Sequence, residues 1–234
     1  SRRRWLAWAL GAMGAGAGPI AQALPARALQ FPRDHGSHPE LRTEWWYVTG
    51  YATAGGRPFG FQVTFFRSRM DATQAMQSAF AAKQLVFAHA AVTDVQGRRL
   101  LHDQRMARAG FGVAEASEAD TAVRPRDWSL QRQDTARGKP DTATSRYTTQ
   151  VVGEHFGLQL QFDATQPLLL QGQQGLSRKG PQAAQASYYY SQPQLAVSGR
   201  IVLDGRTLPI DTTQPARAWM DHEWSEALLA DDAV

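Results

Sequence analysis

The residues best suited to chemistry lie in the segment 219–225, which reads Trp-Met-Asp-His-Glu-Trp-Ser. If this segment is a β-strand, His222 and Trp224 point to one face and Asp221 points to the other. An imidazole can hold a water or take its proton, and an indole ring can stabilise a positive charge beside it. We therefore take His222, Trp224 and Asp221 as catalytic candidates. The alternatives are that His222 and Trp224 only pack between domains, and that Asp221 only orients His222 or caps a turn.

A second group of polar and aromatic residues begins directly after Thr43 and continues in two later segments of the chain. Five residues are candidates for contact with a substrate: Glu44, Trp46, Tyr47, His89 and Tyr189. Glu44 and Trp46 share a face of the expected strand, so a buried and paired Glu44 is plausible. The rings equally suit the closed end of a barrel, and His89 suits a hydrogen-bonded core position. Residues 188–190, all Tyr, alternate faces, so at most two of them line one cavity.

No metal or cofactor site is predicted. His35 and His38 have a ligand-like spacing, but they lie in an expected loop without a nearby third ligand. The chain has no Cys, which excludes disulfides, thiolate zinc sites and a Cys nucleophile. It has no nucleophile-elbow, dinucleotide-binding or Walker pattern either.

The elements that position these residues are expected to be strands. Apolar residues alternate with Gly, Gln and Thr over 59–65, and with Gln over 158–162. Many short segments of this kind, broken by turn residues, predict an all-β barrel or sandwich. One short helix is expected over 72–84, with Asp71 as its N-cap. The polar stretches 115–126 and 134–145 are expected to be surface loops.

The N-terminus has the layout of an export signal. Residues 1–6 read Ser-Arg-Arg-Arg-Trp-Leu, close to a twin-arginine pattern, and a glycine-rich apolar run and a small-residue site at 21–23 follow. We expect residues 1–23 to be this signal, the twin-arginine translocase to be a partner, and the protein to be periplasmic or secreted. The alternative is a short membrane-anchoring helix. The formal net charge is +4, and three of the arginines fall in this segment, so no nucleic-acid partner is expected.

Three blocks in order resemble the carotenoid 1,2-hydratase family, which includes predicted secreted hydrolases. They are Phe31–Gly36 leading to Thr43–Gly50, then Gly60–Arg67 with Phe87–His89, and finally Ser187–Ser191 with Trp219–Ser225. The resemblance runs from about residue 31 to the last residue. It implies a lipocalin-like antiparallel β-barrel followed by the start of a second lipocalin-like barrel.

The resemblance also implies where the domains begin and end and which residues carry the catalysis. Residues 24–43 form an N-terminal extension, 44–215 the first barrel, and 216–234 the beginning of a second, truncated one. The family places catalytic weight on a His and a Trp separated by one residue, which corresponds to His222 and Trp224. It also uses a Tyr and an Asp further along, so we expect residues 24–234 alone to be inactive.

The implied activity is the addition of water to a C=C bond of an isoprenoid or other lipophilic molecule by acid catalysis. Protonation of an alkene gives a cation that water then captures, so we expect a ring-lined pocket beside His222 and Trp224. Two other functions remain open. The same barrel can carry a hydrophobic ligand without reacting with it, and the protein can instead be a secreted hydrolase.

Overall fold

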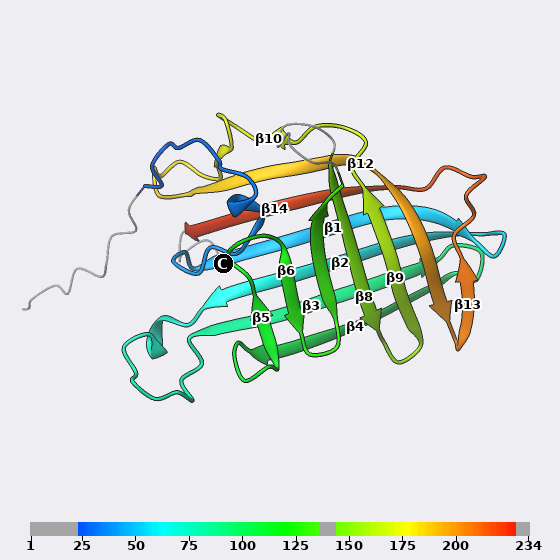
Figure 1. The fold of residues 1–234 in the computed structure, drawn as a ribbon, viewed down its shortest axis with the longest axis horizontal. Coiled ribbons are helices and arrows are strands. Elements are labelled where there is room, and N and C mark those ends of the chain that lie inside the picture. Colours follow the sequence, from blue (N-terminus) through cyan, green and yellow to red (C-terminus); the bar gives the residue numbers. More distant parts are fainter. Residues whose placement is uncertain (1–22, 136–143, 228–234) are drawn as a thin grey trace, which may run out of the picture.

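The computed structural model describes residues 23–135 and 144–227 (Figure 1). The expected export signal, apart from residue 23, lies outside the described residues. In the described ranges, no helix is long and apolar enough to cross a membrane.

The described residues form one antiparallel sheet and two single 3-10 turns, η1 (Arg33–His35) and η2 (Asp71–Thr73). The strands are β1 (Thr43–Ala54), β2 (Arg57–Arg69), β3 (Gln84–Asp94), β4 (Arg99–Arg108), β5 (Ala114–Ala116), β6 (Ala122–Pro125), β7 (Ser129–Asp134), β8 (Ser145–Val152), β9 (Phe156–Asp163), β10 (Leu169–Leu170), β11 (Leu176–Arg178), β12 (Ala186–Leu203), β13 (Arg206–Pro209) and β14 (Arg217–Ala227).

The sheet curls into a nearly closed barrel. Its order is β4-β3-β2-β1-β14-β12-β9-β8-β7-β6-β5, and β10, β11 and β13 pair with β12 (Figure 1). Side chains bridge the gap near the end strands: Arg105 of β4 pairs with Asp127 at 3.2 Å and lies 4.9 Å over the ring of Trp128. The predicted lipocalin-like, all-β barrel is therefore confirmed.

The strand that carries His222 does not begin a separate barrel within the described residues. β14 is hydrogen-bonded to β1 along one edge and to β12 along the other, so it is a central strand of the first sheet. The predicted boundary at residue 216 stays a prediction, and residues 217–227 share a sheet with the strands before it. The alternation of side chains along a strand shows which face each one takes, but it does not show which strands become neighbours.

The barrel interior is filled by side chains. The alternating apolar residues predicted over 59–65 and 158–162 all point inward and are buried. They pack with large rings that are also fully buried, among them Trp46, Trp128 and Tyr147. These buried side chains pack against one another as one hydrophobic core.

The segment before β1 packs across one end of the barrel (Figure 1). Trp46 Nε1 donates to the carbonyl of His35 at 3.2 Å, and Thr121 Oγ1 donates to the same carbonyl at 2.8 Å. Gly36 has no side chain, and a Cβ there would meet the backbone oxygen of Glu118 at 2.4 Å. The close approach fixes this segment, residues 24–42, over the barrel end.

Two local predictions were wrong. The segment 72–84 forms the single turn η2 followed by irregular chain, because Asp71 pairs with Arg69 and provides no cap for a helix. The segment 115–126 is not only a loop, since it contains most of β5 and all of β6. Thr121 and Val123 are buried there despite the polar sequence around them.

Candidate active site

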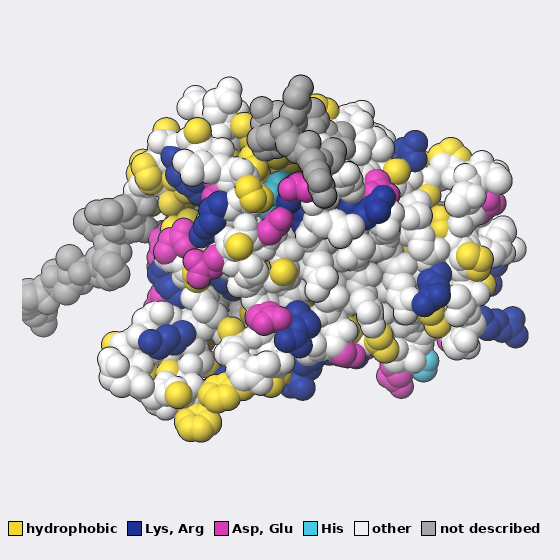
Figure 2. Space-filling model, viewed as in Figure 1, with side chains coloured by type: hydrophobic (Ala, Val, Ile, Leu, Met, Phe, Trp, Pro, Cys, Tyr) yellow, Lys and Arg dark blue, Asp and Glu magenta, His cyan; other side chains and the backbone are white. Residues whose placement is uncertain are grey.

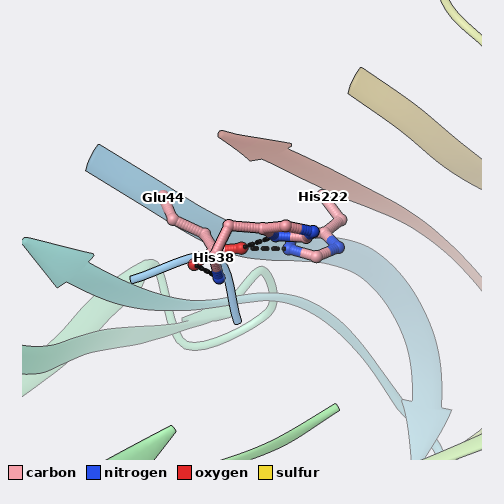
Figure 3. Close-up of side chains that lie close together, drawn as sticks. All are labelled: His38, Glu44 and His222. Carbon is pink, nitrogen blue, oxygen red and sulfur yellow. Dashed lines mark hydrogen bonds and ion pairs between the residues drawn. The ribbon is translucent and has the colours of Figure 1, made fainter. Parts of the chain in front are cut away.

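The centre of the candidate site is the carboxylate of Glu44, which is fully buried (Figure 3). Its Oε1 lies 2.7 Å from Nδ1 of His38 and 2.9 Å from Nε2 of His222. Its Oε2 accepts hydrogen bonds from Nε of Arg67 and from the backbone N–H of His38, both at 2.9 Å. The side chains of His38, His222 and Arg67 are at most 1% exposed. One buried carboxylate therefore joins four elements of the chain.

The strand register places these residues together. In the antiparallel pair of β1 and β14, Glu44 lies opposite Trp224 and Trp46 lies opposite His222. On the other edge of β14, His222 lies opposite Tyr190 of β12. Because alternate residues share a face, all five side chains point into the barrel end.

Two further residues of the site, Asp34 and His38, come from the segment before β1. Asp34, in η1, accepts hydrogen bonds from both terminal nitrogens of Arg27, at 2.8 and 3.1 Å, and from the backbone N–H of Gln30 at 2.6 Å. Its Oδ1 lies 3.0 Å from Nε2 of His38. This local hydrogen-bonded turn holds the imidazole of His38 against Glu44.

Rings enclose both imidazoles that contact Glu44. His38 stacks on Trp224 with ring centroids 4.0 Å apart and an interplanar angle of 2°. His222 stacks on Trp46 at 4.6 Å and 19°. The hydroxyl of Tyr190 lies 3.2 Å from Nδ1 of His222 and 2.8 Å from Nδ1 of a further buried imidazole, that of His35. The hydrogen bonds thus form a continuous chain from Asp34 to Tyr190.

Burial and pairing set the charges of this chain. Burial disfavours ionised carboxyls, but hydrogen bonds from the two imidazoles hold the pKa of Glu44 well below its usual range. Burial also opposes charge on Asp34, yet His38 and Arg27 hold its pKa low. For His38, hydrogen bonds to both carboxylates outweigh burial and raise the pKa. For His222, burial prevails over its hydrogen bond to Glu44 and lowers the pKa to about 4.

These charges make His222 a neutral imidazole at neutral pH, with Nε2–H donated to Glu44 and Nδ1 facing the hydroxyl of Tyr190. A carboxylate behind an imidazole fixes its tautomer and supports it as a proton acceptor. The arrangement can therefore transfer protons in a site shielded from water.

The same atoms are the group in the described residues that best suits a metal ion. Nδ1 of His38, Oε1 of Glu44 and Nε2 of His222 lie within 4.8 Å of one another, and two His with one Glu is a ligand set that zinc uses. The three atoms are hydrogen-bonded to one another, and Arg67 pairs with the carboxylate. A cation there would have to displace protons and lie beside a guanidinium.

Four of the eight residues predicted for the site come together at the barrel end: Glu44, Trp46, His222 and Trp224. The other four lie on the opposite, outer face of the sheet, on β1, β3, β12 and β14: Tyr47, His89, Tyr189 and Asp221. Oδ1 of Asp221 accepts hydrogen bonds from Tyr189 at 3.0 Å, Ser191 at 2.6 Å and Trp219 at 2.7 Å. The residue that orients His222 is therefore Glu44 and not Asp221.

The sequence reasoning did not select several residues of the site: Asp34, His35, His38, Arg67 and Tyr190. The partners of His38, Asp34 and Glu44, lie only four and six residues away, whereas His35 contacts Tyr190, 155 residues further along the chain. Tyr190 lies opposite His222 in the register and Tyr189 does not, but that register depends on the pairing of β12 with β14, which strand alternation does not show.

Comparisons with known proteins agree with this fold. The sequence matches the AttH-like family over residues 22–234. The crystal structure of a Nitrosomonas europaea protein described as an AttH is similar, with a TM-score of 0.75 and 42% sequence identity. That match covers 92% of this chain and 60% of the other, so this chain spans about three fifths of its relative's length.

A second similar structure is kievitone hydratase from Nectria haematococca, with a TM-score of 0.58 and 11% identity over 84% of this chain and 52% of that one. At that identity the likeness concerns the fold alone. No curated protein matches the sequence. The family match and the 42% identical relative settle the classification: the chain belongs to the AttH-like family.

Proposed function

We propose that this protein is a hydro-lyase that adds water to a C=C bond of a lipophilic, isoprenoid-type molecule. The observation that carries the proposal is the buried chain of hydrogen bonds from Asp34 through His38, Glu44 and His222 to Tyr190. The fold shared with kievitone hydratase, a hydratase by name, agrees with it. So does the resemblance to the carotenoid 1,2-hydratases, which remains a prediction from the sequence.

The proposed role of His222 follows from its hydrogen bonds. Water addition requires an acid that protonates the alkene carbon and a base that takes a proton from the attacking water. Nδ1 of His222 has the free lone pair that can take a proton, because Nε2 keeps its own proton and donates a hydrogen bond to Glu44. The nearby rings of Trp46 and Tyr190 are suited to stabilising positive charge, and so is the face of Trp224 that His38 does not cover. Together these groups supply the base half of the reaction.

Export is part of the proposal. The twin-arginine pattern at residues 1–6 supports transport of the folded protein to the periplasm or beyond. A lipophilic small molecule is then the expected partner.

The filled barrel favours this proposal over a lipid carrier. A carrier of the lipocalin type holds its ligand inside the barrel. Here the interior positions are occupied by large side chains such as Phe65, Trp128 and Phe162. A substrate would therefore meet the site at the barrel end, under the segment 24–42.

The test uses the complete protein, incubated with lycopene and with a prenylated phenol, and mass spectrometry to find a product heavier by one water. We expect His222→Gln to lower the rate about 100-fold or more, in line with loss of a general base. His155→Gln is the matched control, because the His155 side chain is 62% exposed. Tight stoichiometric binding of lycopene without product would support a carrier instead. Cleavage of ester or amide probes that requires His222 would support a hydrolase.

A further inference from the structure

Both ring nitrogens of His38 face carboxylate oxygens. Nδ1 lies 2.7 Å from Oε1 of Glu44, and Nε2 lies 3.0 Å from Oδ1 of Asp34. A neutral imidazole has one N–H and one lone pair, so it can donate to only one of two carboxylates. Both acids are ionised, because Arg27 donates to Asp34 and Arg67 donates to Glu44. Both nitrogens of His38 must therefore carry a proton.

The aromatic environment of His38 suits a cation. The Trp224 ring lies parallel to the His38 ring at 4.0 Å, so the negative face of the indole covers the imidazole. This contact changes the expected role of Trp224. The ring was expected to stabilise a cation on the substrate, and one of its faces is instead occupied by His38.

The charged groups around His38 come from four elements and include two carboxylates. The segment before β1 supplies Asp34, Arg27 and Arg33. Strand β1 supplies Glu44 and β2 supplies Arg67, whereas β14 supplies His222, which is titratable but neutral at pH 7. The His222 imidazole has only one carboxylate partner and a tyrosine hydroxyl on its other side. The two imidazoles therefore differ in charge although they contact the same oxygen of Glu44.

We propose that His38 is an imidazolium at pH 7, with a proton on each ring nitrogen, and the residue that positions Glu44 behind His222. His38 and Arg67 fix the two oxygens of Glu44, so that Oε1 is aimed at Nε2 of His222 and Nδ1 stays basic. Asp34 is the second positioning residue, since it binds the far side of His38. The protonation state of His38 stands independently, whereas its effect on turnover rests on the proposed hydratase function.

Zinc would compete for the same atoms. To bind it, His38 would have to lose the proton on Nδ1, and the metal would take the place of the two hydrogen bonds to Oε1. A proton on each ring nitrogen of His38 gives both carboxylates a hydrogen bond without such a change. Metal binding is therefore an alternative that the same experiment can detect.

The first measurement is long-range ¹H–¹⁵N NMR of the histidine rings in the complete, ¹⁵N-labelled protein. We expect one histidine, assigned to His38 by its loss in His38→Gln, to keep both ring nitrogens protonated at pH 7. Asp34→Asn should lower the pH at which this residue loses its proton. Asp94→Asn is the matched control, because Asp94 and Asp34 are each 3% exposed and each pair with an arginine that is 35% exposed.

The second measurement is kinetic. In a protein that hydrates an alkene, Asp34→Asn should lower kcat about 100-fold with little change in KM and should shift the basic limb of the pH profile to lower pH. Asp34→Glu should recover part of the loss, and Asp94→Asn should leave the profile unchanged.

The outcomes separate the two proposals. Absence of hydration with a doubly protonated His38 would remove the hydratase function and leave the charge assignment intact. A His38 ring with one unprotonated nitrogen at pH 7 would overturn the inference. So would stoichiometric zinc that removes the imidazolium signals.

Discussion

Replacing Glu44 with Gln tests whether the buried carboxylate holds the barrel end together. The substitution keeps the size of the side chain but removes its charge. It leaves Arg67 and His38 as cations in a region where neither is more than 1% exposed. Arg67 retains hydrogen bonds to the carbonyl of Leu41 at 2.8 Å and to Gln84 at 3.0 Å, but no negative charge remains beside it.

The expected loss is large. Removing one partner of a buried ion pair costs about 3–5 kcal/mol, because the other charge stays desolvated. The free energy of unfolding of a typical domain is about 5–15 kcal/mol, so Glu44→Gln should remove at least about a fifth of it. Glu115 provides the comparison. Its pair with Arg124, at 3.1 Å, is exposed, with 63% of the Glu115 side chain and 37% of the Arg124 side chain accessible, so Glu115→Gln should cost about 1 kcal/mol or less.

Urea unfolding of the complete protein, followed by tryptophan fluorescence, measures both losses. A double variant with Arg67→Met should recover at least about 1 kcal/mol, because the uncompensated cation is removed with its partner. If Glu44→Gln costs no more than Glu115→Gln, the central carboxylate is not the electrostatic centre of the site. Additive losses in the double variant would lead to the same conclusion.

Three further predictions concern pH, packing and the tyrosine. The pKa of His222 is about 4 when folded and about 6.5 when unfolded, so stability should fall by up to about 3 kcal/mol as pH drops through this range. In His222→Gln the urea midpoint should depend less steeply on pH over this range, because the contribution of His222 is lost. The contribution of buried His35 to the pH dependence should remain. Gly36→Ala should lower the melting temperature and loosen the segment 24–42 in hydrogen exchange, because its Cβ would meet the backbone of Glu118; unchanged exchange would refute the close approach. Tyr190→Phe should cost about 1–3 kcal/mol in urea unfolding, since it leaves Nδ1 of His222 without its partner, and a neutral effect would argue against that hydrogen bond.

Local alternation predicted much of the fold and half of the selected site residues. Phe59 to Phe65 and Leu158 to Phe162 alternate as expected and form the core. The same rule placed His222 with Trp224 and Glu44 with Trp46, each pair on one face. These predictions held because strand side chains repeat every two residues whatever the neighbouring strand is.

The rest of the site depends on contacts that no local pattern carries. Asp34 and His38 lie in aperiodic chain, and they become site residues only because the segment 24–42 packs against β1 and β14. The choice of Tyr189 in place of Tyr190 was an error of one residue, which in a strand moves a side chain to the opposite face. Which face is the inner one depends on the pairing of β12 with β14.

The central position of β14 has a consequence for the order in which the chain can fold. β1 to β4 lie on one side of it and β12 with its neighbours on the other, so β14 is the strand of the described sheet that pairs with both halves. The end of β1 adds a short link to the β12 side, where the backbone N–H of Asp211 donates to the carbonyl of Thr53 at 2.8 Å. Before residues 217–227 are synthesised, the nascent chain contains two half-sheets, and the edges of β1 and β12 that later pair with β14 are still open. These edges can pair with other chains, so the nascent protein is exposed to aggregation until its last described strand emerges.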